Sequence, residues 1–153
     1  MSEATVSAIL ISSAPSGPIE TVELARAIAG AGLEGDRYAK GEGTFSDKPG
    51  TGRQVTLIEA EALEAYTAES GEALSPAEAR RNIVTRGVRL NDLVGREFMV
   101  GSVRVLGCRL CEPCTHLERL TGKGVLRGLV HRGGLRAEFL SDGVIRVGDS
   151  VRT

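Results

Sequence analysis

The sequence is poor in aromatic side chains and has almost no net charge. Trp is absent, and aromatic residues make up 3% of the 153 positions. Modules that bind RNA or single-stranded DNA stack bases on aromatic side chains, so the composition disfavours this class of function. The formal net charge is -1, which provides no overall field for nucleic acid or an anionic membrane surface. We therefore expect neither as a partner.

Long apolar runs and a basic leader are also missing. No stretch approaches the roughly 18 apolar residues of a membrane-spanning helix, and residues 1–5 lack the basic start of a signal peptide. These absences predict a cytoplasmic protein with reduced thiols. Hydrophobic residues at 41% and charged residues at 25% are ordinary for a globular protein, and the length favours a single domain over residues 1–153.

Glycine is abundant, at 20 residues, and it separates many short runs rich in Val, Ile and Leu. This pattern predicts strands at residues 6–11, 54–58, 83–85, 97–100, 103–106 and 144–147. Helices are expected at residues 59–68, after a capping box of Ser75 and Glu78, and at residues 112–129. Residues 22–30 fit a short helix or a strand, and residues 32–52 form a long polar loop of the kind that is often functional. The prediction is a mixed α/β fold dominated by strands, a closed β-barrel with short flanking helices.

The three cysteines fall within seven residues, at Cys108, Cys111 and Cys114. A thiolate is both a strong nucleophile and a soft metal ligand, so this cluster is the first candidate for chemistry. Structural zinc needs a fourth ligand, and His116 and His131 are the only histidines that could supply it. A bacterial iron–sulfur run continues with Cys and Pro, which this chain lacks at positions 118 and 119.

Cys114 differs from its two neighbours. Cys108 and Cys111 fit small buried hydrophobic positions. Cys114 follows Pro113 near the expected start of a helix, where the helix dipole favours the thiolate form. We therefore expect one working thiolate, at Cys114.

Two further places in the sequence have side chains or backbone groups that could bind an anion. Arg80, Arg81 and Asn82 lie where a helix is expected to give way to a strand, and guanidinium and amide groups there suit a phosphate or a carbonyl-rich heterocycle. Arg132 precedes two glycines, whose backbone N–H groups can approach an anion closely. A solvated basic turn and a Gly-Gly hairpin turn are the alternatives that need no ligand.

The long polar loop holds one more cluster. Asp36 and Arg37 are adjacent in it. A functional role would explain them, and so would an ion pair within the loop.

In combination and in this order, six motifs resemble the MOSC domain, the C-terminal domain of molybdenum cofactor sulfurases that also occurs as small stand-alone bacterial proteins. The motifs are Gly-Asp-Arg-Tyr at residues 35–38, Arg-Gln-Val-Thr-Leu-Ile-Glu at 53–59, Arg-Arg-Asn-Ile-Val-Thr at 80–85, Leu-Asn-Asp-Leu-Val-Gly at 90–95, Cys-Glu-Pro-Cys at 111–114 and Gly-Asp-Ser-Val at 148–151. The resemblance implies a β-rich, barrel-like α/β fold. In the sulfurases a domain that binds pyridoxal phosphate precedes the MOSC domain, and we expect this chain to be the stand-alone type of that pyridoxal phosphate-associated family.

The resemblance also implies roles for individual residues. By motif position, Cys114 is the family cysteine proposed to carry sulfur as a persulfide or to ligate molybdenum, and Cys111 takes the less essential position. Arg81, Asn82 and Thr85 match the motif beside the pterin of the bound cofactor. The implied cofactor is the molybdenum cofactor, molybdopterin.

Three more residues carry over from the same resemblance. Asp36 would shape the pocket or act on protons, which makes it the second catalytic candidate after the thiolate. Arg37 and Arg132 would help to hold the phosphate or the pterin.

Three hypotheses follow. The first is a molybdenum cofactor-binding or sulfur-carrier MOSC protein that uses Cys114, as a molybdenum-dependent oxidoreductase with a redox partner protein or as a sulfur transferase. The second is a non-catalytic sulfur-delivery module that depends on a cysteine desulfurase. The third is a small iron–sulfur protein that uses Cys108, Cys111 and Cys114 together.

Overall fold

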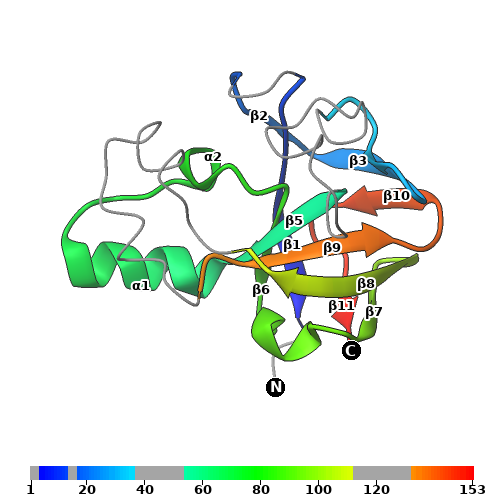
Figure 1. The fold of residues 1–153 in the computed structure, drawn as a ribbon. Coiled ribbons are helices and arrows are strands. Elements are labelled where there is room, and N and C mark those ends of the chain that lie inside the picture. Colours follow the sequence, from blue (N-terminus) through cyan, green and yellow to red (C-terminus); the bar gives the residue numbers. More distant parts are fainter. Residues whose placement is uncertain (1–3, 14–16, 37–53, 112–131) are drawn as a thin grey trace.

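The computed structural model describes residues 4–13, 17–36, 54–111 and 132–153. Its main element is an eight-stranded sheet with the strand order β11-β7-β8-β9-β5-β6-β1-β2 (Figure 1). The strands are β1 (Thr5–Ile11), β2 (Glu20–Val22), β5 (Val55–Glu59), β6 (Ile83–Arg86), β7 (Glu97–Val100), β8 (Val103–Leu110), β9 (Leu135–Phe139) and β11 (Val151–Arg152). Neighbouring strands are antiparallel except β5 and β6, which are parallel.

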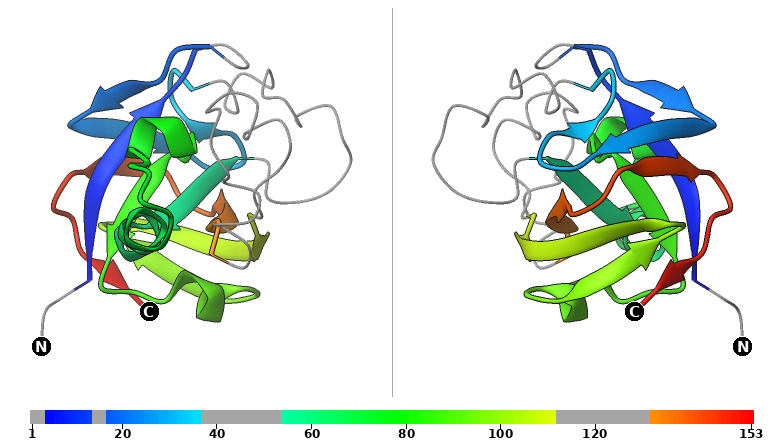
Figure 2. Two further views of the ribbon diagram at one scale, coloured as in Figure 1. Left: turned by 90° about the vertical axis from the view of Figure 1, so that its left-hand side faces the viewer. Right: turned by 90° about the vertical axis from the view of Figure 1, so that its right-hand side faces the viewer.

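The sheet curls until the start of β1 lies beside β11, as the two views in Figure 2 show. A single bridge joins Thr5 to Ser150, and the Val6 N–H donates to the Asp149 carbonyl oxygen over 2.8 Å. The ladder of paired strands nevertheless ends at β2 and β11. The architecture is therefore a curled half-barrel in a strand-dominated α/β fold, and the closed barrel predicted from the sequence is not confirmed.

A smaller sheet packs against the same interior. It contains β3 (Leu24–Ile28), β4 (Gly32–Leu33) and β10 (Gly143–Arg146), in the order β10-β3-β4. Its buried hydrophobic residues belong to the same hydrophobic cluster as the inner face of the large sheet; they are Ala25, Ala27, Leu33 and Ile145. The two sheets therefore share one core.

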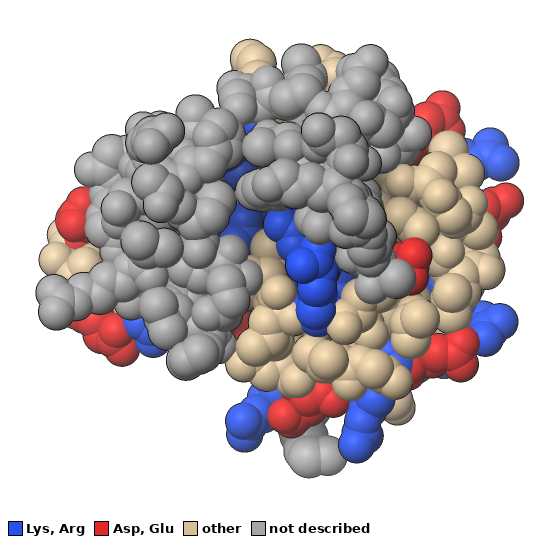
Figure 3. All heavy atoms as spheres, viewed as in Figure 1, with Lys and Arg blue, Asp and Glu red and all other residues tan. Residues whose placement is uncertain are grey.

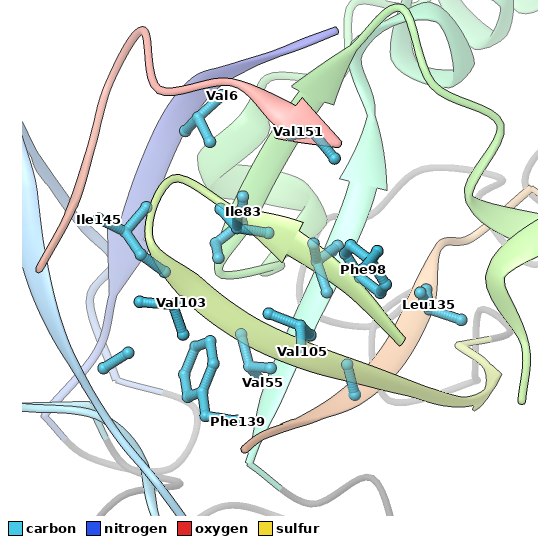
Figure 4. Close-up of a cluster of buried hydrophobic side chains, with 14 of the residues drawn as sticks. Val6, Val55, Ile83, Phe98, Val103, Val105, Leu135, Phe139, Ile145 and Val151 are labelled. Carbon is cyan, nitrogen blue, oxygen red and sulfur yellow. The ribbon is translucent and has the colours of Figure 1, made fainter. Parts of the chain in front are cut away.

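Alternation along the strands determines which side chains enter this core. In β8, Val103 and Val105 are buried while Arg104 between them is exposed. Figure 4 shows these valines on the same inner face as Phe98 of β7 and Phe139 of β9, which are the register partners of Val105 on either side. Burial of one face on this scale supplies the main stabilisation of such a fold, and it leaves the other face of the sheet to polar side chains.

The helices cover part of that outer face. Helix α1 (Ala60–Ser70) connects β5 to the parallel strand β6, together with the short helix α2 (Pro76–Ala79), and a 3-10 turn follows at Leu90–Leu93. Tyr66 and Leu63 of α1 pack with Ile58 and Val84 of the sheet in a second hydrophobic cluster. None of the helices in the described ranges is both long enough and apolar enough to cross a membrane.

Most of the predicted elements are confirmed. The six predicted strands appear as β1, β5, β6, β7, β8 and β10, residues 22–30 adopt the strand alternative, and the capping box of Ser75 and Glu78 is present on both sides. Several elements differ from the prediction: β8 continues to Leu110, which places Cys108 within a strand, and β9 is a strand where an anion-binding or hairpin turn was expected. Strands β2, β4 and β11 were not predicted, and β4 lies at the start of the predicted long loop. The predicted helix at residues 112–129 lies outside the described residues.

Candidate functional site

Arg81 is a buried arginine that connects three segments of the chain. Its Nε donates to the Gly133 carbonyl oxygen over 2.8 Å, and its Nη2 donates to the Cys111 carbonyl oxygen over 3.2 Å. Nη1 donates to the Ala79 carbonyl oxygen over 3.2 Å. The side chain is 8% exposed. Three of the five guanidinium N–H groups are therefore engaged by backbone, so Arg81 acts first as an anchor within the protein.

The same contacts bring together the two ends of residues 112–131. Cys111 precedes this segment and Gly133 follows it, and Arg81 donates to both. The Cys111 N–H also donates to the Gly134 carbonyl oxygen over 2.7 Å. Gly134 has φ +113, and a Cβ there would collide with the Leu57 carbonyl oxygen. The segment that contains Cys114 therefore leaves and rejoins the sheet at one fixed point.

Asn82 joins β1 to β5. Its Oδ1 accepts hydrogen bonds from the Thr56 N–H over 3.0 Å and from the Thr56 hydroxyl over 3.2 Å. Its Nδ2 donates to the Leu10 carbonyl oxygen over 3.1 Å. The side chain is 1% exposed, so both ends of the amide are used to hold strands rather than presented to solvent.

Asp36 lies next to the end of β1. Its Oδ1 accepts a hydrogen bond from the Ser12 N–H over 2.9 Å, and the carboxylate is fully buried. Ser12 is two residues beyond Leu10, the residue bound by Asn82. The structure thus brings Asp36 and Asn82 to the same end of β1, while Arg37 lies outside the described residues.

Thr85 lies apart from these residues. In β6, Ile83 belongs to the main core and Val84 to the cluster under α1, so alternation turns Thr85 toward the interior, the opposite side of the strand from Asn82. Thr85 is fully buried, and its hydroxyl has no hydrogen-bond partner among the described residues. The expected grouping of Thr85 with Arg81 and Asn82 is not seen on one face.

Arg132 contacts α1. Its Nη2 and Nη1 donate to the two carboxylate oxygens of Glu69, over 2.5 Å and 3.2 Å. The hydrogen bond from Arg132 holds the pKa of Glu69 below its ordinary value of 4.5. The guanidinium predicted to bind an anion is therefore paired with a protein carboxylate.

The cysteines occupy different environments. Cys111 is 1% exposed and fits the expectation of a small buried residue, but Cys108 does not. Cys108 is half-buried on the outer face of β8, and its thiol donates to Glu138 Oε1 over 3.5 Å. The other Glu138 oxygen accepts a hydrogen bond from Gln54 Nε2 over 3.2 Å. Cys114 lies outside the described residues.

No three His, Cys, Asp or Glu side chains gather closely enough to hold a metal within the part of the chain that the structure describes. His116 and His131 fall outside that part, as Cys114 does. A metal site or an iron–sulfur cluster that uses them stays a prediction.

A pair of arginines that the sequence did not single out lies on the outer face of the large sheet. Arg109 of β8 is directly opposite Arg136 of β9, and Arg136 is opposite Thr56 of β5. We call this row of three residues the β5–β9–β8 face. Figure 3 shows basic side chains gathered over the middle of the sheet on this side of the molecule. The alternation of apolar and charged residues in Leu135–Phe139 turns Arg136 outward. This sequence pattern could have indicated the outward position of Arg136, but only if residues 135–139 had been predicted as a strand.

Comparison with known proteins identifies the family. The family model of the MOSC domain matches residues 40–152. The chain belongs to the MOSC domain family. A sequence search of curated proteins finds no match. The matched model covers the MOSC domain alone and does not support the association with pyridoxal phosphate that the resemblance suggested.

Solved structures share the fold of this MOSC chain. The YuaD protein from Bacillus subtilis superposes with a TM-score of 0.81 at 16% identity, with 98% of this chain and 94% of that chain covered. YiiM from Geobacillus stearothermophilus gives a TM-score of 0.70 at 14% identity, covering 97% of this chain and 74% of that one. YiiM from Escherichia coli gives 0.67 at 15% identity, covering 97% and 68%. At these identities the likeness concerns the fold.

The described part of the MOSC site can be compared with what a molybdenum cofactor needs. A phosphorylated pterin requires guanidinium or backbone donors for its phosphate. Asn82 and Arg132 have their polar groups engaged within the protein, and Arg81 has two N–H groups left. Arg109 and Arg136 place further guanidinium groups on the β5–β9–β8 face, so the chemistry of the described residues fits such a group.

Proposed function

We propose that this MOSC protein binds the molybdenum cofactor, with the Cys114 thiolate as its metal ligand and the β5–β9–β8 face as the support for its anionic part. The observation that carries the proposal is the position of the anchor. Cys111 lies two residues after Arg109, and the segment that contains Cys114 leaves the sheet there and returns beside Arg136. These contacts support an arrangement in which the Cys114 thiolate acts together with the basic face, at the edge where β8 ends and β9 begins.

The chemistry of the donors supports the same assignment. A thiolate suits a soft metal centre, and guanidinium groups suit phosphate. When bound, the cofactor would supply redox chemistry at its metal. The chain itself would contribute the ligand at Cys114 and the donors of Arg109 and Arg136, and the Arg81 and Asn82 contacts would keep that edge of the sheet in place.

Sulfur carriage is the alternative use of the same thiolate. In that role Cys114 would hold sulfur as a persulfide, and a cysteine desulfurase would be the partner. A persulfide needs one accessible thiol and no basic face. The arginine pair therefore favours the cofactor over the persulfide.

The proposal is tested on protein purified from a host supplied with molybdenum. Metal analysis and pterin fluorescence are compared for wild type, Cys114→Ala and the matched variant Cys108→Ala. We expect molybdenum and pterin in wild type and Cys108→Ala, and a loss of at least tenfold in Cys114→Ala. Equal molybdenum content in wild type and Cys114→Ala would reject the metal-ligand role.

Two further readouts separate the alternatives. If the protein accepts sulfane sulfur through Cys114 and contains no pterin, the persulfide role replaces the cofactor role. If fresh protein is brown and carries stoichiometric iron and sulfide that all three single cysteine variants lose, the iron–sulfur hypothesis replaces both.

A further inference from the structure

Two carboxylates at the junction of β5 and α1 hold the turn that follows β6. Glu59 is the last residue of β5, and its Oε2 accepts a hydrogen bond from the Leu90 N–H over 3.2 Å. Glu61 lies in the first turn of α1, and its Oε2 accepts a hydrogen bond from the Gly87 N–H over 2.8 Å. Each carboxylate therefore fixes the same turn with one oxygen, and no hydrogen bond within the described residues uses its other oxygen.

Two buried oxygen atoms beside this turn have no hydrogen-bond partner among the described residues. One is Oε1 of Glu61, and the other is the hydroxyl oxygen of Thr85, which is fully buried. Thr85 is the register partner of Glu59 in the parallel pair of β5 and β6. Both side chains therefore leave the sheet on the inner face, like the pair of Leu57 and Ile83 before them. Buried oxygens without a donor are uncommon in folded proteins and point to a bound water or ion.

The charges around the two glutamates leave them without a positive partner. Each of the two nearby arginines is paired with a different carboxylate, Arg86 with Glu64 over 2.7 Å and Arg89 with Asp92 over 3.5 Å. In the part of the chain that the structure describes, neither of the glutamates that hold the turn forms an ion pair. Two negative charges therefore stay uncompensated at one place.

The surroundings of Glu59 agree with this count. Burial raises the pKa of Glu59 above its ordinary value of 4.5, against the hydrogen bond from Leu90, which lowers it. The negative charges of Glu61 and Asp92 raise the pKa further, and the charge of Arg89 lowers it. The net effect disfavours the ionised carboxylate, and a cation beside it would reverse that effect.

We propose that Glu59, Glu61 and the Thr85 hydroxyl bind a hard divalent cation, Mg²⁺, where β5, α1 and β6 meet. Two carboxylates balance the charge of such an ion, and oxygen is the donor that it prefers. Mg²⁺ is commonly held by one or two carboxylates, with water in several of its positions, so few protein oxygens are needed. A hydroxyl is one of the donors, so the site differs from a group of three His, Cys, Asp or Glu side chains, which the described residues do not form. The site does not rest on the proposed function, because a thiolate at Cys114 is a soft donor.

The site is tested with Mn²⁺, a paramagnetic ion that shares the preference of Mg²⁺ for oxygen donors. The full chain carries Cys114→Ala in all samples, so that this thiol does not contribute. Amide NMR signals are followed during the titration, and we expect those of Gly87 and Leu90 to broaden first. Broadening that is centred on any other part of the chain would overturn the proposal.

Charge variants determine which carboxylates bind the ion. Glu59→Gln and Glu61→Gln each keep an acceptor for the N–H groups of the turn and remove one negative charge. We expect each to weaken Mn²⁺ binding at least fivefold. The control Glu72→Gln removes the same charge from an exposed residue just after α1 and should change the affinity less than twofold. Equal losses in Glu61→Gln and Glu72→Gln would show an unspecific effect of charge and would reject the site.

Thr85→Val keeps the fold measurable when the third donor is removed. The change replaces a buried hydroxyl that has no partner by a methyl group, so the metal-free protein should be at least as stable as wild type. We expect Mn²⁺ affinity to fall severalfold in Thr85→Val. We also expect MgCl₂ to raise the Tm of wild type more than NaCl of equal ionic strength does, and to lose most of that advantage in the variant. Unchanged Mn²⁺ affinity in Thr85→Val, or equal effects of the two salts on wild type, would overturn the site.

Discussion

The Arg81 guanidinium and the Cys111 carbonyl oxygen are joined by a hydrogen bond of 3.2 Å across 30 residues of sequence. Together with the bond from Arg81 to Gly133, it closes the base of the segment that contains Cys114. Arg81 therefore has a defined structural role whatever ligand the protein binds, and its removal has a predictable cost.

Replacing Arg81 by Ala should destabilise the protein by about 2–4 kcal/mol, because it leaves buried carbonyl oxygens without their donor. Arg81→Lys should recover only part of the loss, since an ammonium group lacks the planar, forked donors with which the guanidinium reaches three carbonyl oxygens. Urea unfolding measures both. The control is Arg96→Ala at an exposed arginine, which should stay within about 0.5 kcal/mol. Equal stability of Arg81→Ala and Arg96→Ala would contradict the anchor role.

Gly134 should tolerate no side chain. A Cβ there would collide with the Leu57 carbonyl oxygen, in addition to the strain of a φ of +113. Gly148 has a similar φ of +94, and a Cβ added there would meet nothing within 4 Å, so this position isolates the cost of φ alone. We expect Gly148→Ala to lose about 1–2 kcal/mol and Gly134→Ala to lose clearly more or to fail to fold. Thermal unfolding measures the loss of stability in both variants. Equal losses would contradict the steric collision at Gly134.

The elements that follow local rules could be predicted from the sequence. The strand at residues 6–11 and the capping box at Ser75 and Glu78 depend on alternation and on contacts three residues apart. Strand β9 was missed although Leu135–Phe139 alternates apolar and charged residues, because the run is only five residues long and follows directly on Gly133 and Gly134, which favour a turn. Its pairing with β5 and β8 is not visible in the sequence.

The site residues show the same limit more sharply. Sequence motifs singled out Arg81, Asn82, Asp36 and Arg132. The first three are buried: Asp36 and Asn82 at the end of β1, and Arg81 where it donates to the Cys111 carbonyl oxygen. Apart from Ala79, the cited hydrogen-bond partners of these three residues lie 24 to 72 residues away. A pattern can indicate that a guanidinium or an amide matters, but only the fold reveals that backbone carbonyls and N–H groups occupy it.

Arg132 should control the titration of Glu69. The pairing lowers the folded-state pKa of Glu69 below 4.5, so it contributes stability above that value and loses it as the pH falls through the lowered pKa. Arg132→Gln removes the donor, and the pKa of Glu69 should rise toward 4.5. Carboxyl NMR titration measures it directly. Glu64, whose pKa is lowered by Arg86, should titrate unchanged in the same variant, and a parallel shift of both groups would indicate a general effect of charge.

Asn82 offers a test in which pH changes the result. Asn82→Ala removes the partners of Thr56 and Leu10 and should cost about 2–4 kcal/mol. Asn82→Asp keeps the acceptor for Thr56 but places a buried carboxylate against the Leu10 carbonyl oxygen. Burial without a donor raises the pKa of such a carboxyl above the roughly 3.9 of an unfolded chain.

The sign of the effect follows from that shift. Because the folded Asn82→Asp protein binds the proton more tightly than the unfolded chain does, its destabilisation is smallest below about pH 4 and grows as the pH rises through the raised pKa. The protonated carboxyl can also donate to the Leu10 carbonyl oxygen, as the amide does. Urea unfolding at about pH 4 and about pH 7 should therefore show Asn82→Asp approaching wild type at the lower pH, while Asn82→Ala keeps its deficit at both. A deficit of Asn82→Asp that does not depend on pH would mean that the amide is not held between the two strands.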